Sequence, residues 1–121
     1  MKKLLLATVA SAAMATAVSA DDVKIGVFLG FTGPIESLVA QMGPGAEAAI
    51  AEVSASGSFM NGSTVTAIRA DTTCVDAGAA TAAAERLITS DKVSGIVGGD
   101  CSGVTTAVSY THLTLPTILL V

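Results

Sequence analysis

Short strand-like segments alternate with longer, alanine-rich helical segments along this chain, and this alternation constrains its fold more than any other feature. Residues 23–29 and 64–69 are rich in β-branched side chains, and residues 95–98 have the composition of a third short strand core. Helices are predicted from Pro44 to just before Gly57, from Asp76 to about Ser90, and from Ser102 onward. This order predicts an α/β fold, a parallel sheet flanked by helices on both faces.

Single residues mark the ends of the predicted helices. Pro44 suits a first helical position, because the N–H group that it lacks is unpaired there anyway. Gly57 suits the left-handed position that ends many helices. Asp76 can cap the second helix with its side chain. Residues 35–43 are compatible with either a loop or a single helical turn.

Apolar residues recur at helical spacing and predict which helix faces pack on the sheet. Glu47 and Glu52 are expected on the opposite side of the first helix. The apolar positions of that helix are Ala46, Ala49, Ile50 and Val53. Those of the second helix are Ala80, Ala83, Ala84, Leu87 and Ile88.

The first twenty residues have the parts of a secretory signal peptide. Lys2 and Lys3 form a positive start, an apolar stretch follows, and small residues ending at Ala20 suit a cleavage site. A membrane anchor is the alternative, and the short apolar run with its Ala, Ser and Thr argues against it. We therefore expect residues 1–20 to be a signal peptide that directs the chain to the periplasm, with the mature protein beginning at Asp21.

Both cysteines, Cys74 and Cys101, lie after the predicted cleavage site. An even pair of cysteines in an exported chain predicts a disulfide, and two buried free thiols are the alternative. Two cysteines with no nearby His make an incomplete metal site, and the acidic residues have no metal-like spacing, so no metal is expected.

The composition excludes several classes of protein. Hydrophobic residues make up 51% of the chain and charged residues 13%, which is too apolar for a disordered protein. Ten Asp and Glu against six Lys and Arg leave a formal net charge of −4, so nucleic acid is not expected as a partner.

Ligands of open parallel sheets bind at the carboxyl ends of the strands, where loops lead into helix N-termini. Three segments fit that description here, residues 31–38, 71–76 and 98–102. The two cysteines lie in the second and third of them. A disulfide would therefore tie together two loops on the expected binding edge.

The order and spacing of several short motifs resemble a known family. The motifs are Asp22-Val23-Lys24-Ile25-Gly26-Val27, Thr32-Gly33-Pro34, Gly45-Ala46-Glu47-Ala48-Ala49, Asp71-Thr72-Thr73-Cys74 and Gly98-Gly99-Asp100-Cys101-Ser102. Together they are similar to the N-terminal lobe of type I periplasmic binding proteins, in the group of branched-chain amino-acid (Leu/Ile/Val) receptors of ABC transporters. The resemblance covers residues 22–107, so we expect residues 21–107 to be a fragment of that lobe.

This resemblance implies a two-lobed receptor, monomeric at full length and without a cofactor. Such a receptor closes on a small amino acid or amide and delivers it to an inner-membrane ABC permease. In the family the two cysteines are bonded, and the Ser after the second one binds the ligand's α-carboxylate, which points to Ser102 with its neighbour Gly103. A hydroxyl beside the free N–H groups of a helix start suits an anion. A plain N-cap role for Ser102 is the alternative.

A third family contact comes from the loop after the first strand, where an aromatic side chain often stacks near the ligand. The matching position here is about Leu38. This departure leaves an amide, urea or aromatic acid open as the ligand, and ordinary packing is the alternative role for Leu38.

Residues 108–121 do not continue the family pattern. The run from Val108 to Thr117 resembles the translation of a transposase-end adapter used in shotgun sequencing libraries. We therefore expect 108–121 to be a non-native tail that contains Tyr110 and His112, and a truncated chain that binds ligand poorly alone. A native strand is the alternative, because residues 115–121 are strand-like in composition.

Two other functions remain open from the sequence. The run Gly99-Asp100-Cys101-Ser102-Gly103 faintly resembles the nucleophile turn of an exported serine hydrolase. It lacks the G-x-S-x-G pattern, and with His112 discounted no His remains to act as the base, so we do not expect an enzyme. A ligand-sensing regulator with the same fold is the other alternative.

Overall fold

A computed structural model describes residues 22–112, and these form the predicted α/β alternation. The strands are β1 (Val23–Leu29), β2 (Val65–Asp71) and β3 (Gly95–Gly98). The helices are α1 (Glu36–Ala55), the short 3-10 helix η1 (Phe59–Asn61), α2 (Ala77–Thr89) and α3 (Ser102–His112). The predicted signal peptide and the strand-like residues 115–121 lie outside the described residues.

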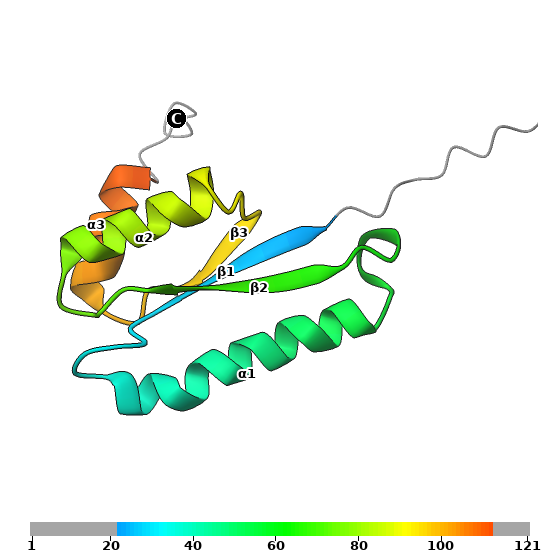
Figure 1. The fold of residues 1–121 in the computed structure, drawn as a ribbon, viewed down its shortest axis with the longest axis horizontal. Coiled ribbons are helices and arrows are strands. Elements are labelled where there is room, and N and C mark those ends of the chain that lie inside the picture. The colour runs from blue at the N-terminus through cyan, green and yellow to red at the C-terminus, as the bar shows by residue number, and fades with distance from the viewer. Residues whose placement is uncertain (1–21, 113–121) are drawn as a thin grey trace, which may run out of the picture.

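The three strands form one parallel sheet in the order β2-β1-β3, so β1 is central. Helix α1 covers one face of this sheet, and α2 and α3 lie together on the other (Figure 1). The fold class predicted from the alternation is thus confirmed. Within residues 22–112, no helix has both the length and the apolar character needed to cross a membrane.

Alternating side chains of β1 supply both halves of the core, because successive residues of a strand point to opposite faces. Val27 and Leu29 pack with Val39 of α1. Phe28 points the other way and is buried in a second cluster. The other fully buried members of that second cluster are Ala70, Ala80, Ala84, Leu87 and Val104.

The predicted third strand is confirmed as β3, which lies at an edge of the sheet formed by residues 22–112. The side chains of Ile96 and Val97 are 39% and 48% exposed. Beside its free edge lies a hollow of about 370 Å³, lined by apolar side chains that include Phe28, Ile88 and Val93. Ile88 is itself 43% exposed, so its expected place in the packed face of α2 is wrong.

Helix α1 begins at Glu36, so the prediction that Pro44 starts the helix is wrong. Pro44 lies inside the helix, where a missing N–H group and ring crowding normally destabilise. The helix continues because residues before and after the proline, Val39 and Ile50 among them, pack against the sheet. The clearest case is Gly43, where an added Cβ would approach Phe31 Cε1 to 2.6 Å.

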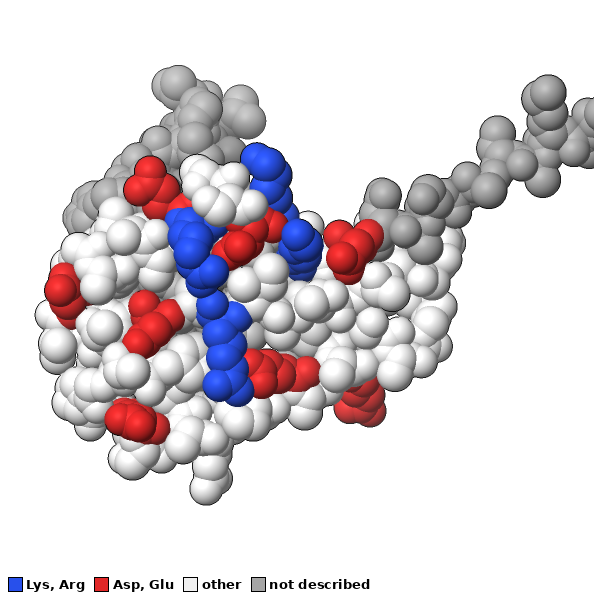
Figure 2. All heavy atoms as spheres, in the orientation of Figure 1, with Lys and Arg blue, Asp and Glu red and all other residues white. Residues whose placement is uncertain are grey.

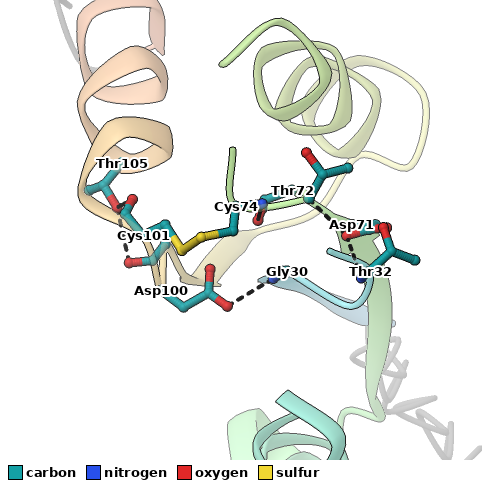
Figure 3. The surroundings of a disulfide bond; sticks show 10 residues. Gly30, Thr32, Asp71, Thr72, Cys74, Asp100, Cys101 and Thr105 are labelled. Atoms are coloured by element: carbon teal, nitrogen blue, oxygen red, sulfur yellow. Dashed lines mark hydrogen bonds between the residues drawn. A yellow bond between two sulfur atoms is a disulfide. The ribbon is translucent and has the colours of Figure 1, made fainter. Parts of the chain in front are cut away.

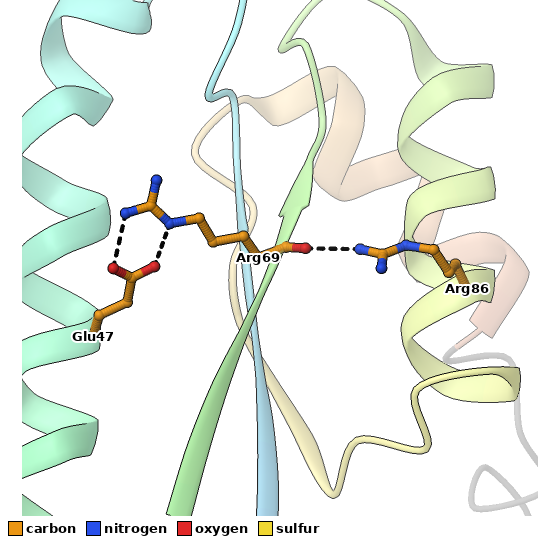
Figure 4. A network of polar contacts seen from close by, with 3 residues as sticks. All are labelled: Glu47, Arg69 and Arg86. Atoms are coloured by element: carbon orange, nitrogen blue, oxygen red, sulfur yellow. Dashed lines mark hydrogen bonds and ion pairs between the residues drawn. The ribbon is translucent and has the colours of Figure 1, made fainter.

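Glu47 faces strand β2 rather than solvent, which corrects its expected place on the outer side of α1. Its carboxylate binds the Arg69 guanidinium with two hydrogen bonds, one of them 2.8 Å long from Nη2 to Oε2 (Figure 4). This bond lowers the pKa of Glu47 and raises the pKa of Arg69. The Arg86 Nη2 atom donates a hydrogen bond to Arg69 O at 2.7 Å. The edge of β2 is therefore linked to helices on both faces of the sheet.

Opposite charges lie next to one another on the face of the molecule shown in Figure 2. Arg69 pairs with Glu47, and Arg86 pairs with Asp91 at 2.9 Å. A line of basic side chains on this face is thus interrupted by carboxylates rather than forming a field of one sign (Figure 2).

The predicted helix ends at Gly57 and Asp76 are confirmed. Gly57 has φ +63° and follows the last residues of α1. The Asp76 carboxylate accepts hydrogen bonds from the N–H groups of Gly78 at 2.8 Å and Ala79 at 3.0 Å, as an N-cap does. Val53 is 43% exposed, so its expected packing in α1 is wrong.

Candidate functional site

The three segments predicted to meet at the carboxyl ends of the strands do lie together (Figure 3). The loop after β1 approaches the loop after β2, and the loop after β3 leads into α3. Parallel strands that start from a common register bring their following loops to one edge of the sheet, which is why residues far apart in sequence meet here.

A disulfide joins two of these loops, as predicted. Cys74 follows β2 and Cys101 precedes α3, and their sulfur atoms lie 2.02 Å apart (Figure 3). Because the bond closes on the residue directly before Ser102, it ties the start of α3 to the loop that follows β2.

Asp71 organises the loops after β1 and β2. Its carboxylate accepts hydrogen bonds from Thr32 Oγ1 at 2.5 Å, from Thr32 N at 3.2 Å and from Thr73 N at 2.9 Å. Burial alone would raise the pKa of Asp71, but the bonds from Thr32, Thr73 and the Phe31 backbone outweigh it and lower the pKa. Asp71 is therefore a charged anchor at this edge.

Asp100 connects the third loop to the central strand. Its Oδ2 atom accepts a hydrogen bond of 2.8 Å from the N–H of Gly30, a buried residue directly after β1 (Figure 3). Gly99 N donates to Phe28 O at 2.9 Å. A side chain at Gly98 is excluded, because its φ is +135° and an added Cβ would come within 1.9 Å of Phe28 O.

Ser102 is the first residue of α3, and its side chain is exposed. The first helical hydrogen bond runs from Thr105 N to Cys101 O at 3.0 Å, so the N–H groups of Ser102–Val104 are those a helix start leaves without an intrahelical partner. Among the described residues, the Ser102 hydroxyl makes no hydrogen bond, so it does not act as an N-cap in this structure. An added Cβ at Gly103 would meet only open space.

Thr105 ties the first turn of α3 to the loop before it. Its hydroxyl shares one proton between Gly99 O at 3.0 Å and Cys101 O at 3.1 Å. The predicted pair Ser102 and Gly103 thus lies on a helix start that other residues hold in place, and both residues are exposed.

Leu38 lies elsewhere on the molecule. It belongs to the first turn of α1, on the sheet face opposite α3, and its side chain is 65% exposed. The structure brings Ser102, Gly103 and the two cysteines together and leaves Leu38 apart from them, so a ligand contact by Leu38 stays a prediction. In the described part of the chain, no group of His, Cys, Asp and Glu side chains is arranged to hold a metal ion.

Sequence reasoning missed the structural roles of Thr32, Asp71 and Asp100. A signal for the two carboxylates was present, because each comes at or shortly after the end of a predicted strand, where parallel strands place side chains at one edge. The partners that they bind, Gly30 and Thr32, are 70 and 39 residues away in sequence.

Comparison with known proteins gives a consistent family. The family model described as periplasmic binding protein matches residues 22–112. A Leu/Ile/Val-binding protein homolog 7 of Brucella melitensis is 36% identical over 110 residues, covering 90% of this chain and 27% of the relative. Its Brucella abortus counterpart is 33% identical over 108 residues, covering 89% of this chain and 26% of the relative.

Solved structures agree. The branched-chain amino acid transporter substrate-binding protein LivJ of Streptococcus pneumoniae, in complex with isoleucine, has a TM-score of 0.67 at 27% identity, covering 74% of this chain and 25% of that one. The leucine-binding protein LivK of Thermotoga maritima has a TM-score of 0.63 at 29% identity, and the match covers 74% of this chain and 24% of that one. A solute-binding protein of R. palustris in complex with 4-hydroxybenzoate has a TM-score of 0.64 at 27% identity, and the match covers 77% of this chain and 24% of that one. The chain spans about a quarter of the length of these relatives.

Proposed function

The chain belongs to the periplasmic binding protein family, and from this premise we propose that it supplies part of the N-terminal lobe of an ABC-importer receptor. The receptor captures a small amino acid of the branched-chain type in the periplasm. The family consists of binding proteins, which supports a binding role and not the hydrolase alternative. Delivery of the ligand to an inner-membrane permease completes the proposal.

The observation that carries the proposal is the outward-facing start of α3. The Ser102 hydroxyl, the N–H of Gly103 and the positive end of the helix form a group of donors suited to a carboxylate. Isoleucine and 4-hydroxybenzoate, the ligands named for two structural neighbours, share a carboxylate and differ in the rest of the molecule. An anion site on this lobe is compatible with both ligands, and residues elsewhere in the receptor would discriminate between them.

The relatives favour a branched-chain amino acid over an amide or an aromatic acid. The Brucella relatives carry Leu/Ile/Val-binding in their names, and two structural neighbours are named for isoleucine or leucine. In our proposal Leu38, an exposed aliphatic side chain in the first turn of α1, adds an apolar contact to the ligand.

The ligand assignment is tested by isothermal titration calorimetry on the full-length receptor, expressed from the source gene. The probes are L-leucine, L-isoleucine, L-valine and 4-hydroxybenzoate, with L-lysine as a control of similar size. We expect saturable binding of at least one branched-chain amino acid and none of lysine. Binding of 4-hydroxybenzoate alone would replace the amino-acid assignment, and failure of all four probes would overturn the proposal.

Export through a signal peptide cleaved near Ala20 belongs to the same proposal, since the family is periplasmic. Mass spectrometry of protein recovered from the periplasm tests the cleavage. We expect a mature N-terminus at Asp21. Retention of residues 1–20 on a membrane-bound protein would favour the anchor alternative instead.

We also propose that residues 108–121 derive from a sequencing adapter. Helix α3 continues through Val108 to His112, Val108 packs against the core, and the family model extends to residue 112. A helix-forming run is compatible with either origin, so the source DNA is the test. A reading frame that continues past codon 107 into other receptor sequence would confirm the adapter, whereas genomic DNA encoding 108–121 would contradict it.

A further inference from the structure

Asp100 makes a contact that the proposed ligand site does not use but depends on. Its Oδ2 atom accepts a 2.8 Å hydrogen bond from the N–H of Gly30, across 70 residues of sequence. Gly30 is buried and the hydrogen bond is partly buried, so this N–H is largely shielded from bulk water. A buried donor that loses its acceptor destabilises the fold locally. The bond therefore couples the end of β1 to the loop that leads into α3.

The loop between β3 and α3 makes other cross-links, and these connect it to different parts of the molecule. The disulfide of Cys101 leads to the loop after β2, and the Thr105 hydroxyl binds carbonyl groups of its own loop. Among the described residues, Asp100 provides the side-chain hydrogen bond from this loop to the central strand. Figure 3 shows its carboxylate directed at Gly30, on the opposite side of the loop from Thr105.

The second oxygen of Asp100 takes no part in the bond to Gly30. Oδ1 is buried and has no hydrogen-bond partner among the described residues. A buried acceptor without a partner is unfavourable, and such departures from local rules concentrate at functional sites. Ser102, the residue proposed to bind the carboxylate, is only two positions further along the chain.

We propose that Asp100 is a positioning residue, which fixes the start of α3 against β1 and so sets where the Ser102 hydroxyl and the Gly103 N–H stand. This inference rests on the proposed function. A ligand group must be met by donors within a few tenths of an ångström, so a loosened helix start weakens binding even when every donor is still present.

The test compares Asp100→Ala with a matched control, Ser54→Ala, in the full-length receptor. Ser54 Oγ accepts a 2.9 Å bond from Val65 N, so the control also removes a side-chain acceptor from a backbone N–H, but at the opposite end of the strands. We expect Asp100→Ala to weaken binding of the best branched-chain probe at least tenfold and Ser54→Ala to leave it within twofold. Asp100→Asn keeps a carbonyl acceptor for Gly30 and is expected to restore most of the affinity.

Amide hydrogen exchange gives a second readout that needs no ligand. The Gly30 amide should lose protection in Asp100→Ala and regain it in Asp100→Asn, while the Thr72 amide, which bonds to Leu29 O at 2.9 Å, stays protected in both. This readout also identifies a variant that has simply unfolded, because Thr72 would then exchange as well.

The outcomes separate the two proposals. If the wild-type receptor binds a probe and Asp100→Ala binds it equally well, the positioning role is overturned and the proposed function stands. Equal losses of affinity in Asp100→Ala and Ser54→Ala would also overturn it, because general destabilisation would then explain both. If the wild-type receptor binds no probe, the proposed function fails, whatever the exchange protection of the Gly30 amide.

Discussion

At the carboxyl ends of the strands, a disulfide and two carboxylates join the loops, whereas hydrogen bonds alone, two of them accepted by the Asp22 carboxylate, connect the segments at the amino ends. Asp71, Asp100 and the Cys74–Cys101 bond link all three loops at the first end. At the other end, Val65 N donates to Ser54 Oγ and Ser94 N donates to Lys24 O at 2.8 Å.

This difference between the two ends shows where the loops around the sheet are cross-linked most strongly. Backbone pairing of β1 with β2 extends over both strands from end to end, so the additional covalent and charged ties at the carboxyl ends are not what forms the sheet. The disulfide and Asp100 converge on the residues before α3, where the proposed site has the exposed Ser102 hydroxyl. Predictions that separate rigidity from stability therefore test this comparison directly.

The largest expected effect comes from the disulfide. Replacing Cys74 and Cys101 by Ala in the receptor should lower the free energy of unfolding by about 3.5 kcal/mol, because the unfolded chain regains the entropy that the cross-link removes. Urea denaturation with and without dithiothreitol measures the loss. Reductant should destabilise the wild type and leave the double variant unchanged, and a wild type insensitive to complete reduction would contradict the role of the bond.

Ser102→Ala should act on affinity rather than on stability. Loss of the hydroxyl should weaken ligand binding by about 1–3 kcal/mol, because a hydrogen bond to a carboxylate is charge-assisted. Calorimetric titration measures the change. Thr106→Ala is the control, since its hydroxyl bonds to Ser102 O at 2.8 Å within the same helix. Unchanged affinity in Ser102→Ala would remove this residue from the site.

Acid should loosen the carboxyl-end loops through Asp71. Its pKa in the folded state lies below the ordinary value of 3.8, so its contribution to stability is complete above about pH 4 and is lost as the pH falls through the lowered value. Thr32→Val removes the side-chain donor and should bring the pKa back toward 3.8. NMR titration of the Asp71 carboxyl measures the shift. An identical titration in the variant would show that this hydrogen bond does not lower the pKa.

The smallest effect is expected at the amino ends. Ser54→Ala should lower the free energy of unfolding by about 0.5–1.5 kcal/mol, the usual net value of one hydrogen bond, without changing affinity. Thermal unfolding and calorimetry on the same preparation measure both quantities. If Ser54→Ala weakened binding as much as Ser102→Ala, the two ends of the sheet would not differ in function as we propose.

The alternation of elements was predictable because it depends on local patterns. The apolar run of β1, the Asp76 cap and the glycine after α1 act within a few residues of themselves, and each is confirmed. The start of α1 was not predictable in the same way. Pro44 normally disfavours a helix interior, and packing of Val39 before it and Ile50 after it outweighs that preference.

The residues of the candidate site also fall into two groups, those predictable from local sequence and those that depend on tertiary contacts. Ser102 at a helix start and the cysteine pair were visible in the sequence, because a motif and an even cysteine count are local or compositional signals. The hydrogen bonds of Asp71 and Asp100 were not, since their partners become neighbours only when parallel strands are aligned. Likewise, the exposure of Ile96 and Val97 depends on β3 lying at the edge.

The sequence by itself determined the α/β class, the helix ends at Gly57 and Asp76, and the likeness to a receptor lobe, because local spacing and residue type specify those features. Only the tertiary structure decided which strand is central, where α1 begins, and that Asp100 reaches Gly30. These depend on contacts between segments up to 70 residues apart, and the free energy of such contacts is defined only once the sheet has assembled.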